Sequence, residues 1–547
     1  MDDELTAYLK DELEGNYDCV DRLVVNAYNP LCHKPAGFRF WWRRLRGSDA
    51  ELDNAHLMRL AGRFSRRVRA AAAAHDIPVI DCERGERKHE IAEEYLANHS
   101  VAAGVFLILV ARSMAMVYEI EHTAQGVIRN IERKKAYVNH YSFHILDPEW
   151  GHLTIKMAGH PPFDAQIMLN GHEWVERQAD TAGLEFVKEG NCFTSTSNAA
   201  GLARVADTLS ESRTVGHLIQ ICERWIYSAC LCFGLDRQEQ EQSGFCYAYS
   251  IFQLEYSHNL LFRDGAQMDR FFQALVGRAW ERLDLPRLKT LFGSSSRAWS
   301  PHSKATRPPR REMVLERPSY DLTVFKLHYG YVTLKAYTKG EHVLRFEAIA
   351  DHVGALHCGR IMLRFPDMVF RLRHFLARFI AVLHCVDRTF IANETLDDLP
   401  APSQLGAVRV GGVDISSARM RAVMAAVVAL AAMPSGFTVA DLTAKVQTMT
   451  GRPDYGPRQA AYDIRKLRAK QLVSKRPSAR RYQSTSAGLR TMGALVVLRE
   501  QVLKPLLTAA TTAAPSVHPM HLTTIDQRYE AVRTAMSPLL SHLGLAA

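Results

Sequence analysis

Residues 457–489 read PRQAAYDIRKLRAKQLVSKRPSARRYQSTSAGL, and this stretch decides the fold expected for the C-terminal part of the chain. Ala461, Ile464 and Leu467 recur at helical spacing, which predicts a helix with one apolar, inward face. Its outward face is cationic and amide-bearing, with Arg458, Gln459, Tyr462, Arg465, Lys466 and Arg468. Two short strands should follow around a basic tip that holds Arg476, Arg480 and Arg481. A helix with such donors on its exposed side suits a DNA major groove.

Two more helices are expected before this one. Apolar residues from Met420 to Ala431 recur at spacings of three and four, and Pro434-Ser435-Gly436 ends that helix. Thr438 is placed as the N-cap of the next helix. The pattern over residues 415–505 resembles the MarR-like winged helix-turn-helix, whose wing leads through a T/S-x-x-G-L step into a further helix, here Ser484 to Leu489. The resemblance implies DNA binding, and a protein-binding winged helix is the alternative.

The charge distribution favours the DNA-binding interpretation. The chain carries a formal net charge of +10, which suits polyanionic partners. Between Gly451 and Arg490, eleven Lys and Arg residues stand against Asp454 and Asp463, a local excess of +9. Nearly all of the excess therefore lies in one short segment, as expected of a binding module attached to a body with other duties.

A chain of 547 residues exceeds what one hydrophobic core usually holds, so several domains are expected. We predict a multidomain α+β or α/β fold, in which a mixed β-sheet body with helical insertions precedes the winged helix-turn-helix. The predicted parts are a mostly helical N-terminal region (1–75), an α/β domain (76–200), a helical region (201–292), a basic linker or loop (293–312), a β-meander with a helix (313–398), a linker (399–414), the winged helix (415–505) and a helical tail (506–547).

Cysteine usage and hydropathy indicate a cellular compartment. The ten cysteines form no C-x-x-C pair and show no metal-finger spacing, which favours reduced thiols. The longest apolar run, from Val101 to Ala111, is too short to cross a bilayer. We therefore expect a cytoplasmic protein without a membrane-spanning segment.

A histidine-rich segment offers metal ligands. Between residues 139 and 164 it contains His140, His144, His152 and His160, together with Asp147, Glu149 and Asp164. Imidazoles and carboxylates on adjacent strands can converge on a divalent metal, because alternate residues share one face. The predicted ligands of Mg²⁺ or Mn²⁺ are Asp147, His152, Glu347 and Asp351, and the predicted catalytic residues of a metal-dependent nuclease are Asp147, His152, Glu347 and Tyr337. Ordinary packing and hydrogen bonding are the alternative role of histidines on strands.

Two further resemblances concern the body of the chain. Residues 138–178 resemble a family of uncharacterised bacterial proteins through Asn139-His140-Tyr141, Asp147-Trp150-Gly151 and Asn170 to Trp174. That resemblance runs through much of residues 80–400 and implies no activity. Lys335 to Lys339 followed by Leu344 to Glu347 is similar to part of the phage and plasmid replication initiators, which implies a DNA-nicking tyrosine, here Tyr337. The His-hydrophobic-His strand of those enzymes is absent from this sequence.

The same strands predict a charged sheet face made of alternating residues, namely Lys326, His328, Lys335, Tyr337, Lys339, Arg345 and Glu347. Such a face could grip a phosphate backbone, chiefly through Lys335 and Lys339, or be a solvated face with cross-strand ion pairs. The acid-free segment 293–311 adds Arg310 and Arg311 as nucleic-acid-binding candidates.

These patterns predict a nucleic-acid-binding protein of a bacterial mobile or foreign genetic element. It would bind DNA through the winged helix, while the body processes or grips DNA or RNA. The alternatives are a non-catalytic transcriptional regulator and an RNA-binding component of a ribonucleoprotein. The sequence has no Walker loop, no G-x-G-x-x-G after a strand, no H-E-x-x-H and no G-x-S-x-G, which disfavours ATPases, dinucleotide oxidoreductases, zinc proteases and serine hydrolases.

Overall fold

The computed structural model shows a mixed α+β protein. It describes residues 3–83, 85–282, 311–319, 322–329, 331–387, 393–477, 479–499, 527–528, 531–532 and 534–535. The predicted basic linker (293–312) and helical tail (506–547) therefore lie almost entirely outside the described residues.

Eleven strands form one large sheet. They are β1 (Leu13–Tyr28), β2 (Val79–Asp81), β3 (Gly104–His122), β4 (Ile128–Asp147), β5 (Gly151–Ala158), β6 (Ala165–Asn170), β9 (Ala248–Phe262), β10 (Arg311–Ser319), β11 (Leu322–Tyr329), β12 (Val332–Lys339) and β13 (Val343–Ala350). Across the sheet the order is β10-β11-β12-β13-β9-β1-β6-β5-β4-β3-β2. All neighbours are antiparallel except β2 and β3, which are parallel.

Helices and short hairpins surround this sheet. The helices of the body are α1 (Glu4–Tyr8), α2 (Pro35–Arg46), α3 (Asn54–Ala74), α4 (Lys88–Asn98), α5 (Gly171–Thr181), α6 (Ala199–Thr208), α7 (Thr214–Trp225), α8 (Arg237–Ser243), α9 (Gly265–Arg282) and α11 (Phe365–Asp387). A hairpin of β7 (Phe186–Lys188) and β8 (Phe193–Thr196) lies outside the large sheet.

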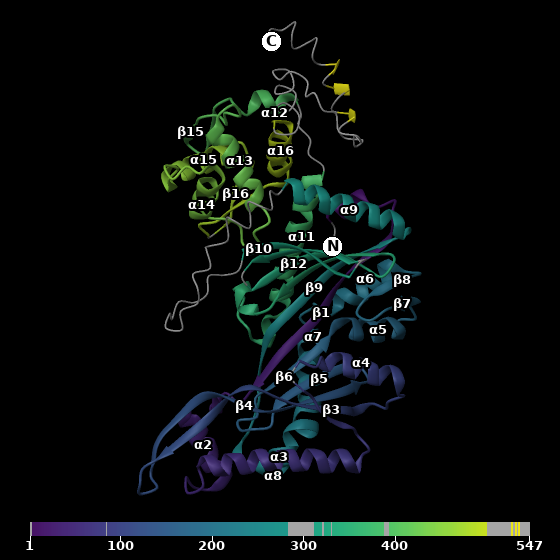
Figure 1. Ribbon diagram of the computed structural model, residues 1–547, viewed down its shortest axis with the longest axis vertical. Coiled ribbons are helices and arrows are strands. Elements are labelled where there is room, and N and C mark those ends of the chain that lie inside the picture. The colour runs from purple at the N-terminus through teal and green to yellow at the C-terminus, as the bar shows by residue number, and fades with distance from the viewer. Residues whose placement is uncertain are drawn as a thin grey trace, which may run out of the picture.

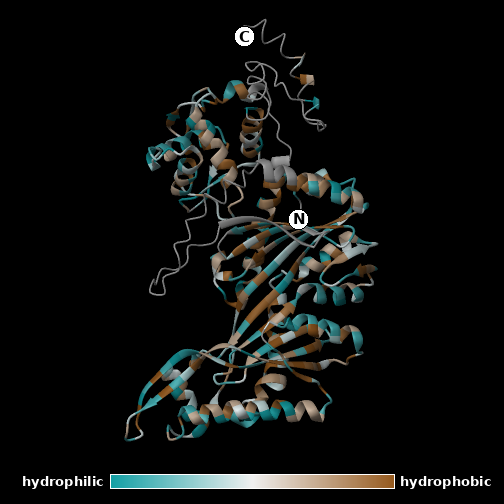
Figure 2. Cartoon of the chain, viewed as in Figure 1, coloured by the Kyte–Doolittle hydropathy of each residue, from teal (hydrophilic) through white to brown (hydrophobic). Residues whose placement is uncertain are grey.

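The two central strands, β1 and β9, correct the sequence-based expectation. Residues 1–75 were expected to be mostly helical and residues 201–292 helical, yet each region supplies one of these long strands. In Figure 1 both run diagonally through the molecule and join β10–β13 above to β3–β6 below. Both strands bury polar residues, including Asp18 and His258, so neither shows the alternating hydrophobic pattern by which strands are recognised. Figure 2 shows both hydrophobic and hydrophilic residues along the two diagonal strands.

The upper part of the sheet is covered on both faces. On one face α11 packs its Phe379 ring parallel to Phe325 of β11, with centroids 6.1 Å apart. On the other face lie α5 and the β7–β8 hairpin, whose residues hydrogen-bond side chains of β12 and β13. The predicted β-meander followed by a helix is confirmed by β11, β12, β13 and α11.

The lower part contains the predicted α/β unit. The strand β2 pairs in parallel with β3, and α4 connects them. On one face, Phe38 of α2 stacks on Tyr118 of β3 at 4.0 Å, and Phe64 of α3 lies 4.9 Å from Tyr141 of β4. A separate small core, which includes Phe106 of β3, packs against α4.

The C-terminal part begins with α12 (Asn393–Asp398) and a hairpin of β14 (Ser403–Leu405) and β15 (Val408–Val410). Three helices follow, α13 (Ala418–Leu430), α14 (Val439–Thr450) and α15 (Pro457–Ala469). A second hairpin of β16 (Val473–Lys475) and β17 (Tyr482–Ser484) then leads to α16 (Ser486–Val497). Residues 399–414 were expected to be a linker, but they form the β14–β15 hairpin in contact with α15. Thr438 caps α14 as predicted, because its side chain accepts from the backbone N–H of Asp441.

No single helix among the described residues is both long and apolar enough to cross a membrane. One bent pair of helical segments, Thr214–Phe233 with Arg237–Ser243, has the length and composition for a crossing when the two are taken together.

Candidate functional site

The exposed side of α15 is the first candidate site. Pro457 starts the helix, and the Oε1 atom of Gln459 accepts the backbone N–H of Gly456 at 3.0 Å. The predicted outward residues Arg458, Gln459, Tyr462 and Arg465 are all exposed. The inward face differs by one position from the expectation, because Ala460 is buried and Ala461 is exposed.

The one acidic residue of α15 points inward. Asp463 is fully buried. It accepts a hydrogen bond from the Tyr455 hydroxyl at 3.1 Å and forms an ion pair with Arg419 at 3.2 Å. Burial raises the pKa of the Asp463 carboxyl above its usual value, although Arg419 opposes the shift. The exposed face of α15 therefore presents cationic, amide and aromatic groups without a carboxylate.

Two of the predicted outward residues are half-buried and held by aromatic rings. The Lys466 ammonium lies 5.2 Å from the centre of the Tyr462 ring. The Arg468 guanidinium lies 6.0 Å from the centre of the Tyr482 ring on β17. Cation–π contacts of this kind fix long side chains without neutralising them. Arg468 thereby connects α15 to the hairpin.

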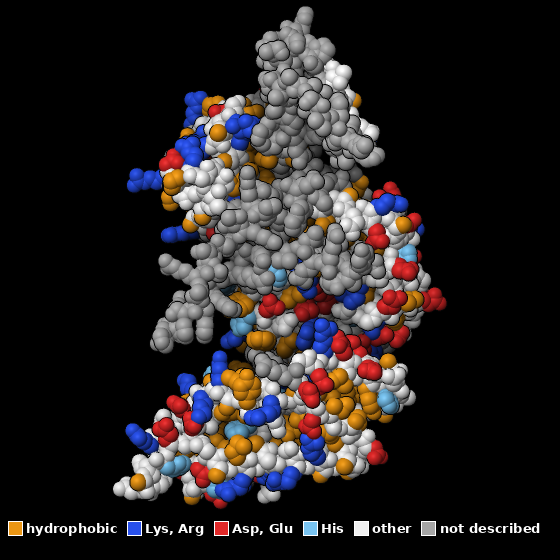
Figure 3. Space-filling view, viewed as in Figure 1, with side chains coloured by type: hydrophobic (Ala, Val, Ile, Leu, Met, Phe, Trp, Pro, Cys, Tyr) orange, Lys and Arg blue, Asp and Glu red, His pale blue; other side chains and the backbone are white. Residues whose placement is uncertain are grey.

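The tip between β16 and β17 differs from the expectation that all its arginines are free for a ligand. Arg476 donates to the carbonyl of Ser435 at 3.0 Å, and Arg481 donates to the carbonyl of Gly436 at 2.9 Å. Both therefore hold the turn between α13 and α14, whereas Arg480 is exposed. Figure 3 shows more Lys and Arg than acidic side chains on the exposed side of these C-terminal elements.

The second candidate site is the polar face of the upper sheet. Lys335 lies opposite Glu347, and Tyr337 lies opposite Arg345, so the predicted alternating residues do share one face. The contacts of Lys335 and Lys339 favour the alternative, a sheet face with cross-strand ion pairs, over a phosphate-gripping surface. Lys335 is paired with Glu347 at 2.8 Å, and Lys339 donates to the side chain of Asn191 on the covering hairpin.

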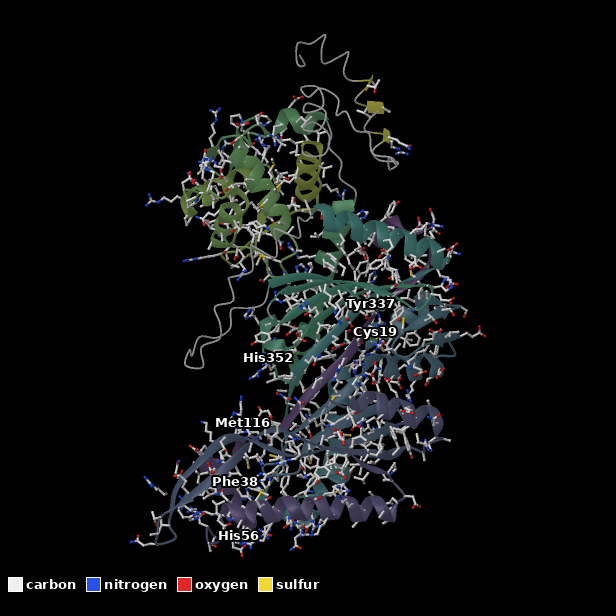
Figure 4. The ribbon with its side chains drawn as sticks, in the orientation of Figure 1. Cys19, Phe38, His56, Met116, Tyr337 and His352 are labelled. Carbon is white, nitrogen blue, oxygen red and sulfur yellow. The ribbon has the colours of Figure 1, made fainter. Side chains whose placement is uncertain are left out.

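A fully buried guanidinium organises this face. The Nε atom of Arg345 donates to Asn259 of β9 at 2.6 Å, and Nη2 donates to the Asn191 carbonyl at 2.6 Å. The Nη1 atom has no hydrogen bond and lies 3.9 Å from the Oδ2 atom of Asp21 on β1. Cys19 and Tyr337, which are labelled in Figure 4, both lie within electrostatic reach of Arg345.

Asp21 and His172 complete the buried cluster. Their Oδ1 and Nδ1 atoms are 3.1 Å apart, and Ser257 donates to the same Oδ1 atom at 2.9 Å. Burial opposes ionisation of Asp21, but the charges of Arg345 and His172 outweigh it and lower the pKa of Asp21. Burial lowers the pKa of His172, although Asp21 acts in the opposite direction. Asp21 and His172 were not identified as site residues from the sequence; His172 stands in the Asn170–Trp174 element, where Asn170 caps α5.

Burial also changes the acid–base properties of the predicted catalytic residues here. Burial and the neighbouring Glu347 raise the pKa of Tyr337. Burial raises the pKa of Glu347 in spite of Lys335. Burial together with Glu347 and Asp21 raises the pKa of Glu255 to about 7. The cluster is therefore a set of mutually dependent charges inside the protein.

The four predicted metal ligands do not form one site. Glu347 is on β13 and Asp147 is on β4, with β9, β1, β6 and β5 between them, a separation of about 24 Å at the usual strand spacing. Asp147 and His152 also point to opposite faces, because Asp147 lies across from Gly151 and Leu146 lies across from His152. Asp351 follows β13. Burial raises the pKa of its carboxyl, and the nearby His328 and Lys335 oppose that shift. Mg²⁺ or Mn²⁺ cannot be bound by these four residues together.

The remaining metal-ligating groups also fit those metals poorly. Among the residues that the structure describes, one group of three such side chains is close enough, Cys19, Asp21 and His172, with ligand atoms within 4.8 Å of one another. Mg²⁺ and Mn²⁺ prefer oxygen ligands, and this set offers one carboxylate beside the Arg345 guanidinium.

His144 and His152 do lie together, as the hairpin pattern predicted. Their Nδ1 and Nε2 atoms are 3.0 Å apart, and Phe106 packs beside both rings. Burial and the neighbouring His152 lower the pKa of His144 to about 3. The pair is therefore neutral near pH 7 and serves packing and hydrogen bonding.

Asp147 has a structural role that accounts for its burial. Its Oδ1 atom accepts the backbone N–H groups of Glu149 and Trp150, both at 2.9 Å, and thereby closes the turn between β4 and β5. Its Oδ2 atom accepts from Arg224 at 2.7 Å and from the Trp225 indole at 2.8 Å. One carboxylate thus joins the turn to α7.

Replacing Asp147 with alanine should lower the free energy of unfolding by about 2–3 kcal/mol, because two turn N–H groups and the Trp225 indole lose their acceptor. Urea unfolding at pH 7 measures the change. Glu149→Ala is the control, since among the described residues Glu149 pairs with the exposed His217 and, at 3.7 Å, with Arg224. Equal stabilities of the two variants would contradict this role.

Of the other predicted nucleic-acid contacts, Arg310 lies outside the described residues, and Arg311 is placed in β10 by its backbone alone.

A comparison of the chain with known protein families finds no matching family model. No curated protein and no solved structure is significantly similar to it. The resemblances to MarR-like winged helices, to the bacterial family and to the replication initiators therefore stay predictions.

Proposed function

We propose that residues 415–505 are a winged helix-turn-helix module that binds duplex DNA, with α15 as the recognition helix and the β16–β17 hairpin as the wing. The exposed face of α15 carries this proposal, because it combines Arg458, Tyr462 and Arg465 while Asp463 is buried and paired. Carboxylates on this face would repel the phosphates of a duplex, so their absence from the exposed side of α15 favours DNA binding.

The spacing on α15 suits the reading of base edges. Arg458, Tyr462 and Arg465 are separated by four and three residues, so they lie on one side of the helix. An arginine there can donate two hydrogen bonds to guanine. Gln459 uses its carbonyl oxygen within the helix start, which leaves its NH₂ group as a donor. The exposed Arg480 at the wing tip is placed for the phosphate backbone.

For the body, the positions of the candidate catalytic residues favour a regulator over a nuclease. Asp147 and His152 serve local contacts in the lower part, and Tyr337 and Glu347 belong to the buried cluster in the upper part. Substrate phosphates would have to reach groups that are separated and covered. We therefore propose a sequence-specific DNA-binding regulator, with the body as its structural support.

Arg465→Ala tests the assigned recognition helix. We expect this variant to lose about 1–3 kcal/mol of binding free energy for a preferred duplex and to discriminate less between duplexes. Arg480→Ala should weaken binding to all sequences alike and make the salt dependence shallower by roughly one ion. The preferred duplex is obtained by selection from a random pool with the full-length protein, and both variants are titrated against it and a scrambled duplex at several salt concentrations.

The control is Arg237→Ala, because Arg237 is exposed on α8, far from the module. If the wild-type protein selects no sequence and binds no duplex at physiological salt, the proposed function is wrong. If both test variants lose affinity without any change in preference, α15 contacts the backbone and does not read bases.

A further inference from the structure

Three buried side chains from two elements of the body face one another beside Arg345. Cys19 and Asp21 are two residues apart on β1, so both point to the same face of the sheet. His172 stands in the first turn of α5, which packs on β1. All three side chains are buried, and one ligand atom from each lies within 4.8 Å of the other two.

The distances in this cluster suit the ligands of a single ion. Nδ1 of His172 is 3.1 Å from Oδ1 of Asp21, yet this nitrogen has no hydrogen bond. Around a tetrahedral zinc ion with bonds of about 2.0–2.3 Å, neighbouring ligand atoms stand roughly 3.3–3.8 Å apart. The Oδ2 atom of Asp21 is also without a hydrogen bond, while Ser257 donates to Oδ1 and holds the carboxylate in place. A metal ion would give both unpartnered atoms a partner.

The surrounding hydrogen bonds are compatible with a metal on Nδ1 of His172. Ligation there leaves the ring proton on Nε2, which lies 3.5 Å from the Tyr17 hydroxyl. Nη2 of Arg345 is 3.3 Å from the same Nε2 atom, but its shorter hydrogen bond, at 2.6 Å, goes to the Asn191 carbonyl. The imidazole can therefore offer Nδ1 to an ion without a loss of these contacts.

The charges around the cluster can be balanced with a divalent cation present. Without an ion, Asp21 has Arg345 as its counter-charge at 3.9 Å, and burial and Asp21 raise the pKa of the Cys19 thiol, which keeps its proton. A metal displaces that proton, so the thiolate and the carboxylate together balance the two charges of the ion. Burial, Glu347 and Asp21 hold the pKa of Glu255 at about 7. Once the metal neutralises Asp21, Glu255 ionises more easily and supplies the charge that balances Arg345.

We propose that Cys19, Asp21 and His172 bind a zinc ion inside the body. A thiolate, an imidazole and a carboxylate are the ligands that zinc takes in proteins, whereas Mg²⁺ requires oxygen ligands. Three protein ligands leave a fourth position for a water molecule. The ion would join β1 to α5 and so stabilise the centre of the body. The proposal does not depend on the proposed DNA binding.

Cobalt in place of zinc tests the site, because a thiolate bound to Co²⁺ gives a charge-transfer band in the near ultraviolet. The full-length protein is unfolded in urea with a chelator and refolded with Co²⁺, since the ligands are buried in the folded state. We expect about one Co²⁺ per chain, the thiolate band, and loss of the band when Zn²⁺ displaces the cobalt. Cys19→Ser should lose the band and bind Co²⁺ at least about tenfold more weakly.

Cys222→Ser and Cys246→Ser are the matched controls, because they remove a buried and an exposed thiol outside the cluster. Both variants should keep the band. A second measurement uses the wild-type protein alone: Zn²⁺, but not Mg²⁺, should raise the urea concentration at the midpoint of unfolding. This readout remains decisive if Cys19→Ser does not fold. The proposal is overturned if the refolded wild-type protein shows no thiolate band, if folded Cys19→Ser keeps it, or if Zn²⁺ and Mg²⁺ raise the midpoint equally.

Discussion

Replacing Arg345 with methionine should lower the free energy of unfolding by about 3–5 kcal/mol, because it leaves the buried carboxylate of Asp21 without its strongest counter-charge. The same change removes the hydrogen bonds to Asn259 and Asn191 that tie β13 to β9 and to the β7–β8 hairpin. Methionine fills most of the space of the arginine stem, so the loss reports on charge and hydrogen bonding more than on a cavity.

The measurement is urea unfolding at pH 7, followed by a signal from the body. Arg237→Met on the surface is the control for a change of composition alone. The double variant Asp21→Asn with Arg345→Met should recover part of the loss, because both charges are then removed from the interior. A loss below about 1 kcal/mol in Arg345→Met would show that the guanidinium is not needed to balance Asp21.

Asp18→Asn is expected to have a comparable effect on the opposite face of the same two central strands. The carboxylate of Asp18 on β1 is 2.5 Å from Nδ1 of His258 on β9 and accepts the Tyr256 hydroxyl at 2.9 Å. The other ring nitrogen of His258 lies 3.3 Å from Asp3. Asp18 and His258 are both buried and depend on one another for charge pairing, so the variant should lose about 3–5 kcal/mol near pH 5.5.

The stability that the Asp18–His258 pair contributes should depend on pH. In the folded protein, the carboxylates Asp18 and Asp3 outweigh burial and raise the pKa of His258, whose usual value is 6.5. Its stabilising contribution is therefore complete below pH 6.5 and is lost as the pH rises through the raised value. Burial opposes ionisation of Asp18, but His258 outweighs it and lowers the pKa below the usual 3.8, so this contribution is complete above that value and is lost in acid.

The difference in stability between wild type and Asp18→Asn should therefore be largest between about pH 4 and pH 6.5 and should shrink on both sides. Urea unfolding across this range measures it. Asp207→Asn is the contrasting variant: burial and then the charge of Asp18 raise the pKa of Asp207, so its ionised form is unfavourable in the folded protein and its removal should not cost stability in this range. A difference that is constant with pH would mean that Asp18 acts as a hydrogen-bond acceptor and not through its charge.

Local sequence patterns were enough to predict the features that depend on neighbours along the chain. The cap at Thr438 and the helical spacing of Arg458, Tyr462 and Arg465 could be derived from local patterns, because a helix brings residues three and four apart together. The strand alternation likewise placed Tyr337 and Glu347 on one face of a sheet, because side chains alternate along a strand.

The contacts of each of these residues depend on how distant parts of the chain pack together. Asp18 pairs with His258 across 240 positions of sequence, so neither β1 nor β9 could be identified as a central strand from its own residues. The same holds for Lys339 and Arg345, whose charges look like a binding surface until the β7–β8 hairpin and α5 contact them. Arg481 turned inward to a carbonyl of a distant turn. Periodicity reports the geometry of one element, whereas burial and charge pairing arise only when elements far apart in the chain pack against one another.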